Sequence, residues 1–364
     1  MPSPQSDCGD GINITNYQKL EHFDLSQFGG IILDESSILK NQTGHYRTAL
    51  VEAAKDIPFR LAATATPAPN DFMELGNHAE FLGVMSYTDM LATFFVHDGG
   101  STQNWRLKGH AENAFWQWMA SWSVMLRKPS DLGYPDDGYD LPPLEYHHHS
   151  VEPDFVPSVE TGTLFPMVAS SLSERRAAAR DTIEDRVALA AAITPPDRPF
   201  VWWCNLNAES EAIAKAIPGA VETRGSDSDD VKEQKLRDFS EGRTRVLVTK
   251  PKVAGFGMNW QHCADTGFVG LNDSWEQFYQ AVRRFWRFGQ KNEVHCHIIA
   301  ASTEGATVAN IKRKEADANR MADAMVRHMS DLSSQEVRGS VRQKADYNPT
   351  VSVIVPDWIN EEAA

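Results

Sequence analysis

The amino-acid sequence predicts an α/β protein built on parallel β-sheets. Two blocks of the 364-residue chain alternate short apolar runs with helix-like segments, a pattern typical of parallel sheets covered by helices. The stretch between these blocks has a different character, first helical and aromatic, then rich in proline and acidic residues. At roughly 150 residues per domain, the length corresponds to about two domains. We therefore expect two α/β units joined by a connector.

The first block contains two expected strands, residues 30–33 and 59–63, linked by a helix over residues 45–55. Both strands are continuous apolar runs, which indicates burial on both faces of a sheet. From about residue 71 to residue 127 the pattern becomes helical and aromatic, so we expect a helical insertion there. Its tryptophans are expected to lie in a core: Trp105, Trp116, Trp118 and Trp122. This first unit spans residues 1–128.

Residues 129–195 are expected to form a connector followed by a linking helix. Six prolines occur over residues 129–157, and residues 131–154 carry seven acidic side chains without a lysine or arginine. This stretch is therefore expected to be extended and to form no regular element. Its three histidines, residues 147–149, are interpreted as a chance surface run rather than a metal site, because adjacent side chains of a strand alternate faces. An alanine-rich helix is expected over residues 173–193.

The second unit, residues 196–303, is expected to be a doubly wound domain. Its expected strands are residues 200–204, 245–249, 266–271 and 294–300. Its expected helices are residues 209–217, 230–241 and 275–287. Residues 304–364 are expected to hold a C-terminal helix, over residues 305–329, and a loosely packed tail.

Composition limits the classes of function. The net charge of −15 excludes a histone-like coat protein and requires that any nucleic-acid contact use a local basic surface. No apolar run approaches the roughly 20 residues of a membrane span, and no leader pattern is visible. We therefore expect a soluble cytoplasmic protein without membrane contact. The four cysteines lie far apart in the sequence, which indicates free thiols rather than disulfides or a cysteine-based metal site.

Two adjacent carboxylates, Asp34 and Glu35, directly follow the expected strand 30–33. Ligands of open parallel sheets bind beyond the carboxyl ends of the strands. One carboxylate at that edge can hold Mg²⁺ through its water shell while its neighbour polarises an attacking water, as phosphoryl transfer requires. The alternative for such a pair is a helix N-cap beside a solvated carboxylate.

Hydroxyl and guanidinium groups add to this pattern. Thr64 and Thr66 follow the next expected strand, where two hydroxyls can sense bound phosphate. Arg284 and Arg287 are three residues apart and would share one face of the expected helix. Two guanidinium groups on one face suit an anionic ligand with several oxygens. The alternative is a solvated basic helix, although the interleaved aromatic residues indicate that part of it is packed.

Taken in order, these motifs resemble those of the superfamily-two helicases, and within them the Swi/Snf-type DNA translocases, especially the compact versions found in bacteriophage genomes. Asp34 and Glu35 resemble the DEAD/DEAH-box-like Walker B motif, and residues 64–70 resemble the third motif. The likeness continues with the fourth motif at residues 200–205, the fifth at residues 255–259 and the sixth at residues 280–290. An ordered set of motifs is more specific than any single one. The likeness covers about residues 12–300 and implies two RecA-like lobes of the P-loop NTPase type.

The phosphate-binding Walker A loop of this family, Gly-x-x-x-x-Gly-Lys-Ser/Thr, does not occur in the sequence. Only about thirty residues precede Asp34, fewer than the missing strand, loop, helix and following strand need at ordinary lengths. The first RecA-like lobe is therefore expected to be incomplete. A truncated gene prediction, a split gene whose partner polypeptide supplies the loop, and a degenerate remnant are all compatible with this.

The resemblance implies a machine that hydrolyses ATP between its lobes and moves along DNA, in the cytoplasm, or in the host cytoplasm if phage-encoded. Within it, Asp34 would organise Mg²⁺ through water, Glu35 would activate water, and Arg284 and Arg287 would reach the γ-phosphate. The further roles implied are nucleotide contact for Gln280, Gly255, Gly257 and Asn259, coupling for Thr64 and Thr66, and DNA contact for Asn16, Tyr17, Asn70, Asn205, Lys250 and Lys252.

An alternative of a different class is a non-hydrolysing DNA- or protein-binding remnant of such a motor. The absent Walker A loop favours this alternative. The presence of Asp34, Glu35, Arg284 and Arg287 favours the motor, because a remnant free of catalytic constraint has no reason to keep them.

Overall fold

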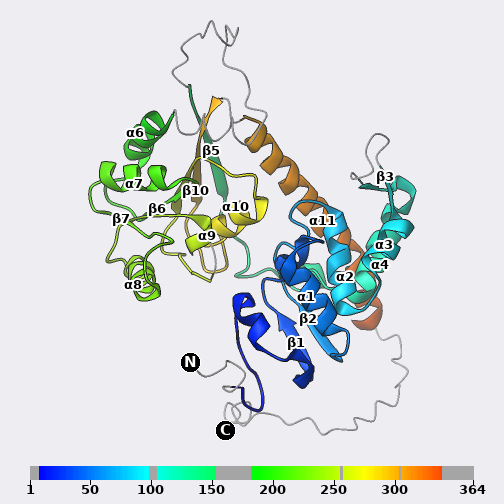
Figure 1. Ribbon diagram of the computed structural model, residues 1–364. Helices are drawn as coiled ribbons and strands as arrows, with labels where there is room; N and C mark the ends of the chain where they lie inside the picture. The colour runs from blue at the N-terminus through cyan, green and yellow to red at the C-terminus, as the bar shows by residue number, and fades with distance from the viewer. Residues whose placement is uncertain (1–7, 98–104, 153–181, 255–256, 303–304, 338–364) are drawn as a thin grey trace, which may run out of the picture.

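A computed structural model describes residues 8–97, 105–152, 182–254, 257–302 and 305–337 (Figure 1). The expected α/β class is confirmed, because helices accompany a sheet of six parallel strands. The strand order is β5-β10-β9-β6-β8-β7. These strands are β5 (Leu144–Val151), β6 (Phe200–Cys204), β7 (Ala220–Glu222), β8 (Val246–Thr249), β9 (Asp265–Val269) and β10 (Val294–Ala301).

Helices cover both faces of this sheet, as expected for a doubly wound domain. They include α6 (Ile183–Ile193), α7 (Asn207–Ala216), α8 (Asp229–Ser240), α9 (Pro251–Ala254) and α10 (Trp275–Val282). On one face, Phe200 and Trp202 of β6 pack in a core with α6 and α7. On the other face, Val201 and Trp203 pack in a core with α8 and α10. Every residue of β6 is buried for this reason.

The expectation that the connector forms no regular element is wrong for β5. This strand lies at the edge of the six-stranded sheet and pairs with β10 in parallel register from Leu144 opposite Val294 to Val151 opposite Ala301. Pairing with β10 overrides the local signal of prolines and acidic residues. The described part of the expected linking helix is α6, and residues 153–181 lie outside the described ranges.

The first lobe contains a two-stranded parallel sheet of β1 (Gly30–Leu33) and β2 (Phe59–Ala62). One face packs on α1 (His45–Ala54), with Leu33 in the shared core. On the opposite face, Ile32, Phe59 and Leu61 are 69%, 76% and 55% exposed. The expectation that both faces are buried is therefore wrong for the residues described. The short 3₁₀ helices η2 (Tyr17–His22), η3 (Leu25–Gln27) and η4 (Ser36–Lys40) complete this region.

The region expected to be a helical insertion contains several helices and has its own core. It contains α2 (Leu75–Leu82), α3 (Tyr87–Phe94), α4 (Glu112–Trp122), the antiparallel strands β3 (Phe95–His97) and β4 (Trp105–Leu107), and the 3₁₀ helices η5 (Phe72–Glu74), η6 (Gly109–Ala111) and η7 (Pro129–Leu132). Trp116 is buried, and Trp105, Trp118 and Trp122 pack against the same core half-buried. Three of the four cysteines are buried and Cys8 is partly exposed, and none of the four, all within the described ranges, forms a disulfide.

The long helix α11 (Gly305–Val337) belongs to two cores. Ile311, in its N-terminal half, packs in the core of the six-stranded sheet. Met321, Met325 and Met329, further along, pack in the core of the helical insertion. Figure 1 shows α11 running from the six-stranded sheet to α4. The helix extends beyond the expected end at residue 329, and residues 338–364 of the expected tail lie outside the described ranges.

Within the described ranges, no helix combines the length and the apolar composition that a membrane span requires.

A packing prediction follows from Gly267 of β9, which lies opposite Trp202 of β6. An ideal Cβ at Gly267 would lie 2.3 Å from Cζ3 of the indole ring, and the ring is held because its Nε1–H donates to Thr194 Oγ1 at 2.8 Å. We expect Gly267→Ala to lower the free energy of unfolding by about 1–3 kcal/mol through overpacking, as measured by urea unfolding. Gly225→Ala is the matched control, because a Cβ there meets only Val253 Cγ2 at 3.9 Å. Wild-type stability of Gly267→Ala would contradict this account.

Candidate functional site

The two carboxylates after β1, Asp34 and Glu35, lie where the backbone is strained. Glu35 has φ 51° and ψ 50°, and among the residues described it is the one non-glycine residue with positive φ. The strain is held in place because Ala63 N–H donates to Leu33 O at 2.8 Å and Ser36 N–H donates to Ala63 O at 2.9 Å. Glu35 occupies the N-cap position of η4, but its side chain caps no backbone N–H. Strain of this kind clusters at functional sites, which makes Glu35 a candidate site residue.

Glu35 meets the second lobe through Gln280. The Gln280 Nε2–H donates to Glu35 Oε2 at 3.0 Å, although 245 positions separate the two residues. Gln280 is buried, and its Oε1 has no hydrogen-bond partner. Burial, together with the neighbouring Asp34 carboxylate, raises the pKa of Glu35, and the positive charge of Arg284 opposes this rise. A carboxylate with a raised pKa is suited to accept a proton from water.

The two arginines of the sixth motif lie beyond the end of a helix rather than on its face. The prediction of a helix to residue 287 is wrong, because α10 ends at Val282 and the chain continues in turns. Arg284 is buried and donates to Gln280 O at 3.1 Å and to Met258 O at 3.0 Å. Burial and the nearby Arg287 lower the pKa of Arg284, whereas Glu35 raises it. Arg284 therefore lies within electrostatic reach of the catalytic candidate Glu35.

Arg287 has a different environment. Its guanidinium donates to the side-chain oxygen of Asn259, a predicted nucleotide contact. Gly257, two residues before Asn259, has φ 75°, which fits the tight loop that the sequence predicts. Gly255 lies outside the described residues. The hydrogen bond between Arg287 and Asn259 thus joins the described part of residues 255–259 to residues 280–290.

Glu276 forms a second contact between the lobes, and sequence reasoning missed it. Its carboxylate is buried and accepts hydrogen bonds from Ser37 Oγ and Lys40 Nζ of the first lobe. Glu276 lies four residues before Gln280 on α10, so both side chains share one helix face. That spacing was the available signal, but the sequence could not identify the lobe that this face meets.

The residues of the third motif lie at the end of β2. Thr64 Oγ1 accepts a hydrogen bond from Thr66 N–H at 3.1 Å, and the Oγ1 of the buried Thr66 has no partner. Asn70, predicted to contact DNA, donates to Glu74 at 2.7 Å and accepts from Lys314 of α11 at 2.8 Å. Lys314 also donates to the backbone oxygen of Asp273 at 2.7 Å. Asn70 therefore helps to fasten the lobes together.

The remaining predicted DNA contacts fall into two groups. Near the carboxylates, Tyr17 donates its hydroxyl to Asp34 O at 2.6 Å, and burial raises its pKa to about 12, with Asp34 and Glu35 adding to the rise. Its neighbour Asn16 caps η2. At the carboxyl ends of β6 and β8, Lys250 donates to Asn205 O at 3.1 Å and to Asn207 Oδ1 at 2.6 Å, and Lys252 is exposed on α9.

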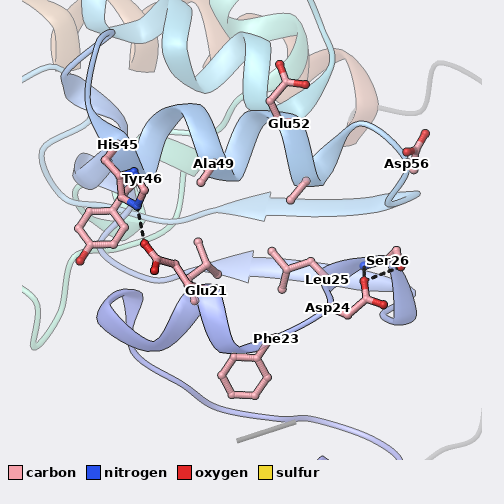
Figure 2. Close-up of a pocket in the computed structure, with 12 residues that line it drawn as sticks. Glu21, Phe23, Asp24, Leu25, Ser26, His45, Tyr46, Ala49, Glu52 and Asp56 are labelled. Atoms are coloured by element: carbon pink, nitrogen blue, oxygen red, sulfur yellow. Dashed lines mark hydrogen bonds and ion pairs between the residues drawn. The ribbon is translucent and has the colours of Figure 1, made fainter. Parts of the chain in front are cut away.

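A groove of about 350 Å³ lies between η2, η3 and α1 (Figure 2). No predicted site residue lines it. Its carboxylates are Glu21, Asp24, Glu52 and Asp56, and Glu21 forms an ion pair with His45 at 2.7 Å. Negative charge of this kind repels phosphate, so the groove is not the expected nucleotide site.

A pH prediction follows from the buried residue His78. Its Nε2 lies 3.2 Å from Oγ of Ser36, the residue that follows Glu35 in the chain. Burial lowers its pKa from 6.5 to about 4. The folded state therefore keeps His78 neutral, and the associated stability is complete above the unfolded pKa and is lost as the pH falls toward the folded pKa.

Between about pH 7.5 and about pH 5, His78 alone should remove about 2 kcal/mol from the free energy of unfolding. We expect His78→Gln to flatten this loss in urea unfolding at the two pH values. His22→Gln, at an exposed histidine, is the control. Equal pH dependence of His78→Gln and wild type would show that His78 is not held neutral.

No family model matches the chain, and no curated protein matches its sequence. Among solved structures, the C-terminal part of the Fun30 ATPase domain aligns with TM-score 0.32 and 14% identity over 43% of this chain and 56% of that one. The C-terminal domain of the DEAD-box protein Dbp5 aligns with TM-score 0.32 and 15% identity over 38% of this chain and 80% of that one. Neither likeness is close enough to carry a residue's role to this chain.

Proposed function

We propose that this chain is part of an ATP-dependent DNA helicase or translocase of the Swi/Snf-like type. The observation that carries the proposal is the contact between Glu35 and Gln280, which brings a strained acidic strand end against the buried sixth-motif segment of the other lobe. Two-lobed motors need such an interface, because closure there couples hydrolysis to movement. The ordered motifs of the sequence support the same assignment.

The described residues fit part of an ATP and Mg²⁺ site. Asp34 is exposed beside Glu35 and can hold Mg²⁺ through water. Bound Mg²⁺ neutralises phosphate charge. The buried Gln280 Oε1 without a partner is an acceptor available to a ligand or a water at this interface. The chain lacks the Walker A loop that holds the β- and γ-phosphates, so the fit is incomplete.

Within this site each side chain has a distinct task. Glu35 accepts a proton from the attacking water, and its raised pKa suits that task. Gln280 orients the Glu35 carboxylate and reports lobe closure. Arg284 and Arg287 supply positive charge toward the γ-phosphate from the second lobe. Thr64 and Thr66 link the site to the DNA-contacting surface.

The exposed face of β1 and β2 supports completion of the lobe by another segment. Ile32, Phe59 and Leu61 form a continuous apolar face, because Leu61 lies opposite Ile32 in the register and Phe59 is two residues from Leu61 on the same strand. A two-stranded sheet is marginal by itself, and parallel sheets are normally covered on both faces. We infer that the occupant is the polypeptide segment that carries the Walker A loop.

DNA is the proposed ligand along which the protein moves. The net charge of −15 repels DNA as a whole, so contacts must come from local groups. Lys252, Lys250 and Asn205 offer such groups at the carboxyl ends of β6 and β8, and Asn16 and Tyr17 offer others beside Asp34.

Reconstitution of ATPase activity tests the proposal. Alone, the chain should release phosphate far below ~1 s⁻¹, the lower end of ordinary enzyme rates. The Walker A polypeptide, sought in the coding sequence immediately upstream, should restore DNA-stimulated turnover. Turnover at ~1 s⁻¹ by the chain alone would contradict the need for a partner. DNA binding without turnover, even with that partner, would favour the non-hydrolysing remnant.

The same assay tests the docking face. The double variant Phe59→Thr with Leu61→Thr should lose the stimulation by the partner, because the apolar face that it covers becomes polar. Val124→Thr changes an equally exposed apolar residue away from this face and should keep the stimulation. Undiminished stimulation of the double variant would place the partner elsewhere.

A separate prediction concerns Arg287. In the reconstituted enzyme, Arg287→Ala should reduce turnover by about 10³–10⁵ if it acts as an arginine finger, with little change in melting temperature. Arg283→Ala is the matched control. It removes a guanidinium from the same segment, but this guanidinium lies over the Trp286 ring at 5.1 Å and has no proposed role in turnover, so turnover should be retained. A large fall in melting temperature with turnover retained would assign a structural role to Arg287.

A further inference from the structure

Histidines from two neighbouring strands form a ladder on one face of the six-stranded sheet. His147 and His149 lie on β5, and His295 and His297 lie on β10. The parallel register places His297 opposite His147, so all four share a face. His147 Nε2 is 3.1 Å from His295 Nδ1, and His149 Nε2 is 3.1 Å from His297 Nδ1.

Glu145 adds a carboxylate to the first of these pairs. It lies opposite His295 in the register, on the same face as His147. Its Oε2 is 3.8 Å from His147 Nε2 and 3.8 Å from His295 Nδ1. Among the described residues, this is the one group of three or more such side chains with ligand atoms close enough to share an ion.

The triangle of ligand atoms has the size of a metal site. With the sides given by these three separations, the point equidistant from the three atoms lies about 2.1 Å from each. Zinc–nitrogen and zinc–carboxylate bonds are about 2.0–2.2 Å long. The spacing of the three atoms therefore matches the bond lengths of a single bound ion.

The chemistry of the donors selects the class of ion. Two imidazoles and one carboxylate form the ligand set of open, catalytic-type zinc sites, and imidazole favours first-row transition ions over Mg²⁺ or Ca²⁺. Glu145 is 52% exposed, so an ion can reach the site from solvent.

We propose that Glu145, His147 and His295 bind a divalent first-row transition ion of the Zn²⁺ type. The ion cross-links β5 to β10 and thereby fastens the connector between the lobes to the second lobe. The proposal is independent of the ATPase function, because none of its ligands belongs to the helicase-like motifs. The interpretation of residues 147–149 as a chance run is revised: alternation does place His148 on the opposite face, but the partners of His147 come from another strand.

The second histidine pair serves as an internal comparison. His149 and His297 are separated by the same distance as the first pair, but among the described residues no carboxylate joins them. We therefore assign the ion to the pair that includes Glu145. His148, exposed on the same strand, supplies a matched control for the loss of one surface imidazole.

The test uses the full chain, purified without a histidine tag and treated with EDTA. Titration with Co²⁺ should produce visible absorption bands that saturate at one equivalent, and Zn²⁺ should displace them. His147→Gln and His295→Gln should abolish stoichiometric binding, and His148→Gln and His149→Gln should retain it. Zn²⁺ should raise the melting temperature of wild type but not of the first two variants.

Circular dichroism and melting temperature in EDTA establish that each variant is folded. If the histidine variants unfold, Glu145→Ala takes their place, because this half-exposed side chain contributes little packing and should weaken Co²⁺ binding. Bands that persist in Glu145→Ala and in the two histidine variants would overturn the proposal. So would loss of binding in His148→Gln, and so would charge-transfer bands typical of thiolate, which would place the ion on cysteine.

Discussion

The placement of the two lobes depends on one continuous helix that is buried in two separate cores. Ile311 of α11 packs beneath the six-stranded sheet, and Met321 and Met325 pack inside the helical insertion. Lys314, between these points, joins Asn70 of the first lobe to the backbone of Asp273 in the second. Because an α-helix resists bending, burial at both ends sets the distance between the lobes. The contact between the carboxylates after β1 and the face of α10 depends on that distance.

The charges at this interface serve specificity more than stability. The buried carboxylate of Glu276 is matched by Lys40 and Ser37, and Glu35 by Gln280 and the field of Arg284. Buried ion pairs often gain little net free energy, because desolvation offsets their attraction, but an unmatched partner is costly. Any other register of the two lobes would leave these groups unmatched. The interface therefore selects one relative position of the lobes.

Sequence patterns predicted the elements that are apolar on both faces and failed where tertiary contacts decide. Strands such as β6 and β8 were predictable because every residue is buried. The strand β5 was missed, because it contains three consecutive histidines and no fully buried residue, and because prolines lie on both sides of it in the sequence. Its pairing with β10 is a tertiary contact that the local sequence does not reveal. The end of α10 was misplaced, because Phe285 and Trp286 continue an apolar pattern after the helix stops. The exposed face of β1 and β2 reads as buried in the sequence, since apolar composition does not reveal whether a covering element is present.

Of the candidate site, the carboxylates and arginines were predictable from motif order, whereas the Glu276 contact depends on a lobe arrangement that no local pattern encodes.

The length of α11 has a mechanical consequence. Thirty-three helical residues form a rod roughly 50 Å long. A tilt of about 5° around Lys314 would move Met329, fifteen residues further along the helix, by about 2 Å. A small change in the relative position of the lobes would thus be transmitted by α11 to the core of the helical insertion. Lys314 is the point at which α11 is hydrogen-bonded to both lobes, and the methionines further along the helix pack against α4.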